Sequence, residues 1–322
     1  MMFKIPLKYL KPLDYLFILR PTLFFPVWII TLAGYSAYST VNGTVIWWQT
    51  SINWLTLFNF FILTLAAGAT FILNQLQDIE TDRDNKKLFL ISENHIPPEK
   101  ALKIAYVLIC LSLVVYLIQS VLLFIVIALF ILFWGYLYNF APFKWKDRPI
   151  LGIITNLIGG VFLFSIGWLM AGEFQVKIFI QMVPYVFAWG SVALLTTLPD
   201  EKGDLIHKKK TFAVKYGRSI TVWMAFIWML LGFILGLILH DPIITHPILI
   251  SLPLYIIMLA KPNDIWVLRT IRYPLLFIAL ILCVQFPLFF FVLLVNFYIA
   301  RIYYITRFNL DYPTFKVEED DA

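Results

Sequence analysis

Apolar stretches of about 20 residues recur along the whole of this 322-residue chain and constrain its fold more than any other feature. A helix of that length crosses a bilayer, whereas a transmembrane strand would show shorter stretches of alternating hydrophobicity. Backbone polar groups in lipid must be satisfied internally, so continuous apolar runs favour helices over a barrel. The sequence therefore predicts an all-α integral membrane protein, and residues 1–322 are taken as one domain.

We predict nine transmembrane helices. The last apolar stretch is too long for one straight span and contains Pro287, so it is either one kinked or overhanging helix or a span followed by a surface segment. The predicted spans are 15–39, 54–77, 100–118, 121–140, 150–171, 176–198, 219–239, 243–260 and 273–300.

Basic residues predict the orientation, because lysine and arginine are enriched in cytoplasmic loops. With a cytoplasmic N-terminus, all but four of the 25 lysine and arginine residues fall on the cytoplasmic side. This basic face fits ordinary attraction to anionic lipid headgroups, and it also fits a mouth for an anionic substrate. The four residues on the other side are Lys177, Arg301, Arg307 and Lys316.

Acidic residues are rare in the chain and form two similar clusters at the ends of two predicted spans. Asn74, Asp78 and Asp82 are spaced four residues apart, which on a helix places them on one face. Asp200 and Asp204 repeat the four-residue step at the end of the sixth span. By the predicted topology both clusters lie on the cytoplasmic side, and an acidic residue next to a span is by default a functional-site hypothesis.

The two clusters are related by a constant offset. Asp200 follows Asp78, and Asp204 follows Asp82, by 122 residues, and the same offset relates two pairs of lysines, Lys86 and Lys87 to Lys208 and Lys209. This indicates two four-helix pseudo-repeats, at about 15–140 and 150–260, followed by a last helix.

Facing carboxylates repel one another unless a hard cation lies between them. Mg²⁺ prefers oxygen ligands and is commonly held by a few carboxylates together with phosphate oxygens of a substrate. Lysines directly behind the acidic residues would meet those phosphate oxygens. The pattern therefore predicts a site for Mg²⁺ and a diphosphate.

The clusters also resemble the motifs of the UbiA superfamily of intramembrane prenyltransferases. The resemblance rests on N-x-x-x-D-x-x-x-D at 74–82 and D-x-x-x-D at 200–204. It extends to Arg20-Pro21, the tract 136–146 (YLYNFAPFKWK), Lys210-Thr211 and Tyr216-Gly217. It implies nine helices around a central cavity, and transfer of a polyprenyl group from a prenyl diphosphate to an acceptor after Mg²⁺-assisted ionisation of the diphosphate.

The resemblance implies a role for each matching residue. The catalytic residues would be Asp78, Asp82, Asp200, Asp204 and Tyr138. The Mg²⁺ ligands would be Asn74, Asp78, Asp82, Asp200 and Asp204. Contacts to the diphosphate would come from Asn74, Arg20, Lys144, Lys146, Lys209 and Lys210.

The expected partners are the bilayer, a donor such as geranylgeranyl diphosphate, and a hydrophobic or aromatic acceptor, with no nucleic acid. The acceptor class stays open among aromatics, tetrapyrroles, glycerol-phosphate lipids and carotenoids. A multi-span transporter of an anionic solute is the alternative function, although transporters commonly place ionisable residues near the membrane midplane and these acids lie at span ends.

Overall fold

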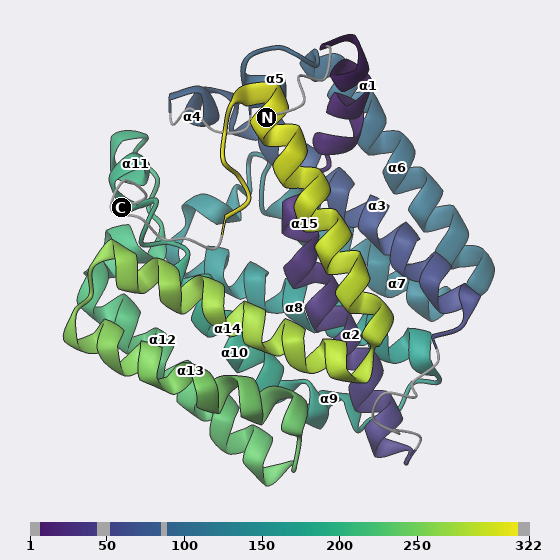
Figure 1. Cartoon of the computed structure of the whole chain (residues 1–322), viewed down its shortest axis with the longest axis vertical. Helices are drawn as coiled ribbons and strands as arrows, with labels where there is room; N and C mark the ends of the chain where they lie inside the picture. The colour runs from purple at the N-terminus through teal and green to yellow at the C-terminus, as the bar shows by residue number, and fades with distance from the viewer. Residues whose placement is uncertain (1–6, 44–51, 85–88, 315–322) are drawn as a thin grey trace.

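The computed structural model describes residues 7–43, 52–84 and 89–314, and every regular element within these ranges is a helix (Figure 1). Nine of the described helices are long and apolar enough to cross a membrane, and the apolar helix Val121–Leu137 is shorter. The predicted all-α membrane fold and the number of nine membrane-length helices are therefore confirmed. The nine differ from the predicted spans at two places, because the span predicted at 121–140 is the shorter helix and the span predicted at 273–300 is two helices.

The helices follow one another along the chain with short connections. In order they are α1 (Leu7–Phe17), η1 (Pro21–Leu23), α2 (Phe24–Val41), α3 (Trp54–Gln77), α4 (Ile79–Asp84), α5 (Phe89–Ser92), α6 (Pro98–Gln119), α7 (Val121–Phe130), the π-helical η2 (Ile131–Leu137), η3 (Trp145–Asp147), α8 (Pro149–Ala171), α9 (Ile178–Gln181), α10 (Val183–Leu195), α11 (Glu201–Ile206), α12 (Phe212–Ile238), α13 (Pro242–Ala260), α14 (Asp264–Gln285) and α15 (Pro287–Phe308).

Proline and short polar side chains set where several helices begin. Pro149, Pro242 and Pro287 are the first residues of α8, α13 and α15, where the N–H that proline lacks has no helical partner in any case. The Asn53 side chain caps α3 by accepting a 2.7 Å hydrogen bond from the Thr56 backbone N–H. These local signals therefore lie where the apolar stretches begin.

The single span predicted over 273–300 is wrong, because two membrane-length helices occupy this part of the chain. α14 ends at Gln285 and α15 begins at Pro287, with Phe286 alone between them. Phe286 has φ −121° and ψ 79°, outside the helical region, as expected for a residue directly before proline. Pro287 therefore ends one helix and starts the next, where we expected either a kink or a surface segment.

The extra helix reverses the expected position of the chain's C-terminal part. The Arg307 guanidinium, near the end of α15, lies 3.2 Å from the carboxylate of Asp14 in α1. The end of α15 and α1 therefore lie at the same end of the helix bundle (Figure 1). The prediction that put Arg301 and Arg307 on the side opposite the N-terminus is wrong, because it counted one helix too few after α13.

Glycines allow α2 and α8 to approach closely. A Cβ atom on Gly34 would lie 2.0 Å from the carbonyl oxygen of Phe164, and one on Gly167 would lie 1.8 Å from that of Thr31. Small residues at the α2–α8 contact thus bring the two backbones together, as is common between membrane helices.

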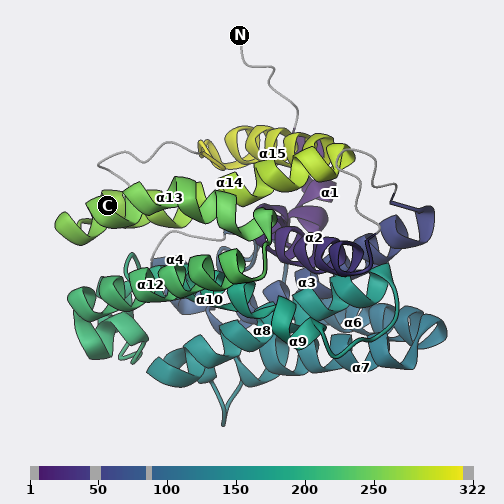
Figure 2. The ribbon, with the colours of Figure 1, turned by 90° about the horizontal axis from the view of Figure 1, so that it is seen from below.

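The long helices are arranged in layers. Figure 2 shows α2 and α10 between a layer containing α6 and α7 and a layer containing α14 and α15.

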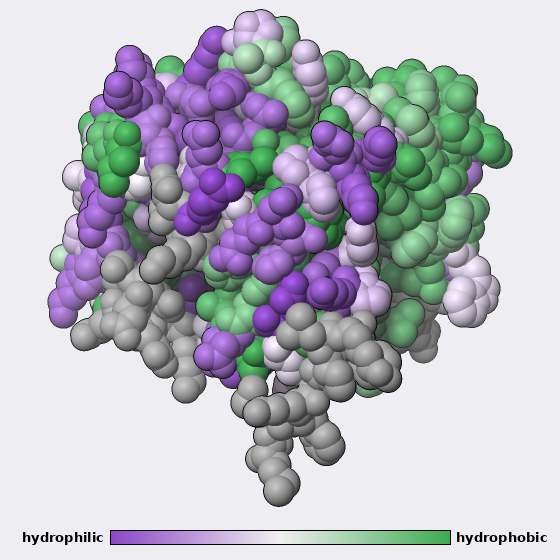
Figure 3. All heavy atoms as spheres, turned by 90° about the horizontal axis from the view of Figure 1, so that it is seen from above, coloured by the Kyte–Doolittle hydropathy of each residue, from purple (hydrophilic) through white to green (hydrophobic). Residues whose placement is uncertain are grey.

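Hydrophilic side chains gather at one end of the bundle. Figure 3 views the end that carries the short helices α4 and α5, and shows a broad hydrophilic area beside a strongly hydrophobic flank. The acidic clusters belong to the segments at this end, because α3 leads into α4 and α10 leads into α11.

Candidate active site

The first acidic cluster lies where α3 ends. Asn74 lies in the last turn of α3, and Asp78 caps the helix directly after Gln77. Asp82 belongs to the separate helix α4, and its backbone N–H donates to the Asp78 carbonyl oxygen at 2.7 Å. The helix is therefore interrupted at Asp78, although a helical turn still joins the two aspartates.

Two lysines from distant parts of the chain contact the Asp78 carboxylate. Lys146 Nζ, in η3, donates to Asp78 Oδ2 at 2.6 Å, and Lys209 Nζ lies 3.4 Å from Oδ1. Asn74 Nδ2 also donates to Oδ2 at 3.0 Å. Burial by itself would raise the pKa of Asp78, but the two ammonium groups outweigh burial and hold that pKa below its ordinary value.

The second acidic cluster lies on α11, which follows α10 after a short turn. Asp200 precedes the first residue of α11 and is exposed, whereas Asp204 is buried inside the helix. The Asp204 backbone N–H donates to the Asp200 carbonyl oxygen at 2.8 Å. Burial raises the pKa of the Asp204 carboxyl above its ordinary value.

Lys209 connects the two clusters. Its side chain contacts Asp78, and its backbone N–H donates to the Asp204 carbonyl oxygen at 2.9 Å. Burial by itself would lower the pKa of Lys209, but the charges of Asp78, Asp204 and Asp147 outweigh burial and raise it. The Lys209 ammonium group therefore contacts Asp78 of the first cluster and lies within electrostatic reach of Asp204 of the second.

Asp82, the last residue of the first cluster, lies close enough to Asp78 for the two charges to interact. Burial, and then the neighbouring charge of Asp78, raise the pKa of Asp82 to about 7, although Arg20, Lys146 and Lys209 act in the opposite direction. The Arg20 guanidinium thus lies within electrostatic reach of Asp82. A cation placed between these carboxylates would relieve the repulsion that raises this pKa.

The structure separates the basic residues that the sequence suggested for diphosphate binding. Lys146 and Lys209 lie at Asp78, and Arg20 lies on the Asp82 side. Lys144 and Lys210 have exposed side chains. The backbone N–H of Lys210 donates to the Asp147 carbonyl oxygen at 3.2 Å. Lys210 therefore joins the segment after α11 to η3 through its backbone.

Tyr138 lies directly after η2, at the edge of the site. Its side chain is hydrogen-bonded to Asn156 of α8, and its carbonyl oxygen accepts a 3.2 Å hydrogen bond from the Lys146 N–H. Burial, together with the charges of Asp78, Asp147 and Asp204, raises the pKa of Tyr138 to about 12. The phenol is therefore neutral near pH 7 and is able to donate a hydrogen bond.

Asn139 is a site residue that the sequence analysis missed. Its side chain is fully buried, its Oδ1 accepts from Asn74 Nδ2 at 2.8 Å, and its Nδ2 donates to the Trp134 and Gly135 carbonyl oxygens. Asn139 therefore fixes the amide of Asn74, which leaves that side chain oriented toward Asp78. The signal that could have identified Asn139 was an asparagine at the end of an apolar span, where a polar side chain is expected to have a specific role.

Asp147 was also missed, and it bears on whether the residues present fit a metal ion. Its Oδ1 atom is buried and has no hydrogen-bond partner. Among the described residues, no three His, Cys, Asp or Glu side chains come close enough to hold a metal by themselves. The donors at hand are carboxylate and amide oxygens, which suit Mg²⁺ when water and substrate oxygens complete its coordination.

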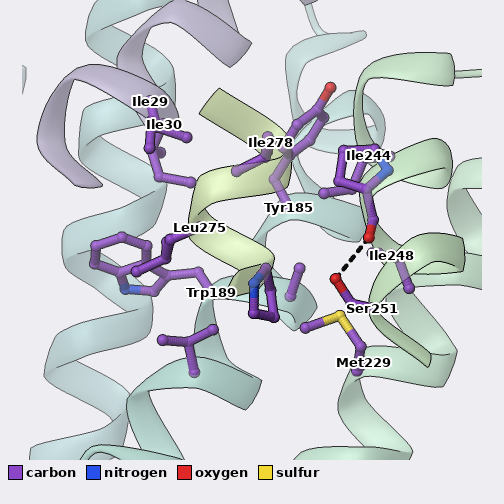
Figure 4. A pocket seen from close by; sticks show the side chains of 14 residues that line it. Ile29, Ile30, Tyr185, Trp189, Met229, Ile244, Ile248, Ser251, Leu275 and Ile278 are labelled. Atoms are coloured by element: carbon purple, nitrogen blue, oxygen red, sulfur yellow. Dashed lines mark hydrogen bonds between the residues drawn. The ribbon is translucent and has the colours of Figure 1, made fainter. Parts of the chain in front are cut away.

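An apolar cavity lies among the helices α2, α10, α12, α13 and α14. Figure 4 shows side chains from α2, α10, α12, α13 and α14 converging on it, among them Tyr185, Trp189 and Met229. Ser251 also lines the cavity, and its hydroxyl donates to the Pro247 carbonyl oxygen at 2.6 Å. Hydrocarbon is therefore the chemistry that this cavity suits.

Aromatic residues connect the cavity with the site. Trp189 lines the cavity, and its indole N–H donates to the Asn156 carbonyl oxygen at 2.8 Å. Asn156 in turn bonds Tyr138, and Trp134 lies with its ring 6.5 Å from that of Trp189. Trp189, Asn156 and Tyr138 thus link the cavity to the site, and the Phe71 and Trp134 rings pack with centroids 6.0 Å apart.

Comparison with known sequences supports the resemblance stated from the motifs. The model of the UbiA prenyltransferase family matches residues 27–281. A digeranylgeranylglyceryl phosphate synthase from Methanococcus aeolicus is 27% identical over 184 residues. That match covers 56% of this chain and 61% of the relative, which is less than two thirds of the relative's length.

Solved structures share the fold. A structure of digeranylgeranylglyceryl phosphate synthase in membranes matches with a TM-score of 0.63 at 21% identity, over 85% of this chain and 97% of that chain. A UbiA homolog from Archaeoglobus fulgidus bound to GPP and Mg²⁺ matches with a TM-score of 0.65 at 17% identity, over 84% and 99%. The same homolog bound to DMAPP and Mg²⁺ also has a TM-score of 0.65.

Proposed function

We propose that this chain, which belongs to the UbiA prenyltransferase family, transfers a polyprenyl group from a prenyl diphosphate to an acceptor in the membrane. The chain is an integral multi-pass membrane protein, and the family resemblance is confirmed by the match over residues 27–281. The observation that carries the proposal is that Lys209 joins the two clusters, by contact with Asp78 and by electrostatic reach to Asp204, in a helix bundle that also encloses an apolar cavity.

In this proposal the carboxylates hold a divalent metal. Mg²⁺ is supported by the oxygen donor set and by the Archaeoglobus fulgidus homolog, which was solved with GPP and Mg²⁺. When bound, Mg²⁺ supplies Lewis-acid chemistry and charge neutralisation for a departing diphosphate. The proposed ligands are Asn74, Asp78, Asp82, Asp200 and Asp204.

The chain's own residues would bind the diphosphate and orient the donor. Lys146, Lys209 and Arg20 are placed to neutralise diphosphate oxygens by charge-assisted hydrogen bonds. The neutral phenol of Tyr138 donates a hydrogen bond to an anion without adding a charge. We assign Lys144 and Lys210 a weaker, long-range role, because their side chains are exposed.

The reaction breaks the C1–O bond of the donor, and the diphosphate leaves with the bonding electrons. The resulting allylic cation forms a bond to the acceptor, which loses a proton. The Trp189 indole lines the cavity with the Trp134 ring 6.5 Å from it, and aromatic faces of this kind would stabilise positive charge. The apolar cavity excludes water, which would otherwise capture the cation.

For the substrates, we propose geranylgeranyl diphosphate as donor and a glycerol-phosphate lipid as the first acceptor to test. The relative from Methanococcus aeolicus, a digeranylgeranylglyceryl phosphate synthase, supports this choice. Aromatic, tetrapyrrole and carotenoid acceptors are the alternatives. From the distribution of basic residues we propose that the clusters and the N-terminus face the cytoplasm.

The test is turnover by purified protein in detergent or liposomes. Labelled geranyl, farnesyl and geranylgeranyl diphosphates are incubated with one acceptor from each class and MgCl₂, and products are identified by mass spectrometry. We expect a prenylated product with release of diphosphate, and loss of both on adding EDTA, with recovery when excess MgCl₂ is restored. Absence of product and of diphosphate release with every donor would contradict the proposal.

A further inference from the structure

The two ends of the described chain, which lie outside the family match, contact each other. The match covers residues 27–281, whereas α1 and Arg20 precede it and α15 follows it. In α1, the buried Asp14 accepts hydrogen bonds from the Tyr303 hydroxyl at 2.6 Å and from Arg307 Nε at 3.2 Å. The Phe17 and Tyr303 rings stack with centroids 3.6 Å apart. α15 is therefore anchored to α1.

The same C-terminal region also holds the turn at residues 20–23. Asn296 Nδ2 of α15 donates to the Pro21 carbonyl oxygen at 2.9 Å. The Tyr312 hydroxyl, after α15, is hydrogen-bonded to Thr22 Oγ1 at 3.0 Å. Two independent bonds thus tie the C-terminal region to the residues directly after Arg20.

Arg20 itself needs such support. Its backbone has φ +57° and ψ +63°, the left-handed region that residues other than glycine rarely adopt. From α3, Gln75 Nε2 donates to the Ile18 carbonyl oxygen at 2.8 Å, and Gln75 is only three residues before Asp78. The segment that carries Arg20 is therefore bonded both to α3, which leads into the first acidic cluster, and to α15.

We propose that α15 and residues 309–314 form a positioning element that holds Arg20 beside the first acidic cluster, where its guanidinium meets the diphosphate of the donor. This inference rests on the proposed function for the identity of the anion. Asn296 and Tyr312 are positioning residues, because they act on the anion only through the turn that carries Arg20.

The experiment compares the full chain with the double variant Asn296→Ala/Tyr312→Phe, which removes both bonds to the turn and keeps the aromatic ring at 312. The matched control is Arg301→Gln, which breaks the exposed Arg301–Asp311 pair of the same region without touching the turn. Binding of inorganic diphosphate is measured by calorimetry in excess MgCl₂, and KM and kcat are measured with geranylgeranyl diphosphate.

We expect the double variant to raise the Kd for diphosphate and the KM for the donor about fivefold, with kcat within about twofold of the wild type. The control is expected to bind diphosphate as the wild type does. In an Arg20→Gln background, which itself binds diphosphate more weakly, the double variant should add less than about twofold, because the positioned group is gone.

Two outcomes would overturn the inference. One is an unchanged Kd in the double variant, including the case in which its thermal midpoint falls, because α15 would then only stabilise the fold. The other is the same fold-change with and without Arg20. Wild-type protein that binds no diphosphate would refute the proposed function and this inference together. If the wild type turns over the donor and the double variant has an unchanged Kd and KM, only this inference is refuted.

Discussion

The two acidic clusters repeat one sequence pattern, yet they occupy different structural settings. Asp78 caps the 24-residue helix α3 and is contacted by Lys146, Lys209 and Asn74. Asp200 is exposed at the start of the six-residue helix α11, and Asp204 is buried within it. The two clusters therefore differ at their first aspartate, since Asp78 is tied to other segments by three side chains whereas Asp200 is exposed. The second aspartate of each, Asp82 or Asp204, lies on a six-residue helix.

The lysines account for this difference. Under the 122-residue offset, Lys209 corresponds to Lys87, which lies outside the described residues. Lys209 nevertheless contacts Asp78 of the first cluster, as does Lys146 from the connection between η2 and α8. The charge balance of the first cluster is thus set by residues outside its own pseudo-repeat. We retain the duplication of a four-helix unit as a proposal.

Removing one aspartate from each cluster gives the largest expected effect on activity. The change in stability then distinguishes the structural surroundings of the two aspartates. We expect Asp78→Ala and Asp200→Ala each to reduce diphosphate release at least about 100-fold, because each removes charge that the proposed metal site needs. Only Asp78→Ala should also destabilise the fold, by about 1–3 kcal/mol, because Lys146 is 9% exposed and would lose its carboxylate partner.

Turnover assays and thermal midpoints in detergent measure both effects, with Glu80→Ala in α4 as an exposed acidic control expected to match the wild type. Full turnover by both aspartate variants would contradict the proposed mechanism. Equal loss of stability in both would show instead that the two clusters have the same setting.

A smaller effect distinguishes the lysines of the tract 136–146. We expect Lys146→Met to lower kcat/KM for the donor about 30-fold, because it removes the ammonium group 2.6 Å from Asp78. Lys144→Met should stay within about threefold, because the Lys144 side chain is exposed and acts only at long range. Similar losses in the two variants would place the diphosphate nearer Lys144 than the structure indicates.

The smallest expected effect concerns the amide behind the first cluster. Asn139→Ala should lower the free energy of unfolding by about 1–3 kcal/mol, because Asn74 Nδ2 and the carbonyl oxygens of Trp134 and Gly135 lose a partner. Thr196 is the counterpart of Asn74 in the second cluster, and its hydroxyl donates only to the Ala193 carbonyl oxygen of its own helix. Thr196→Ala is expected to change stability by less than about 0.5 kcal/mol.

Thermal melts of the two variants, with diphosphate binding by calorimetry, provide the measurement. Asn139→Ala should also weaken diphosphate binding, because Asn74 is no longer oriented toward Asp78. If the Thr196 variant lost as much as the Asn139 variant, the second cluster would have buried support of its own.

Much of the fold followed from local features of the sequence. The apolar stretches predicted the membrane helices, because a helix is the structure that satisfies its own backbone in lipid. The error at 273–300 arose because length and hydropathy do not show where one helix stops, although Pro287 stood at the break. The positions of Arg301 and Arg307 followed from that error, since one missing helix reverses the side of every later residue.

The sequence by itself determined the membrane class, the family and the two aspartate clusters, because hydropathy and motif spacing are read along the chain. Only the tertiary structure decided which residues share the site. It joined Lys146 and Lys209 to Asp78, put Asn139 behind Asn74, and anchored α15 to the turn of Arg20. These contacts join residues up to 275 positions apart, as Asn296 and Pro21 show, and side-chain contacts over such separations are set by helix packing.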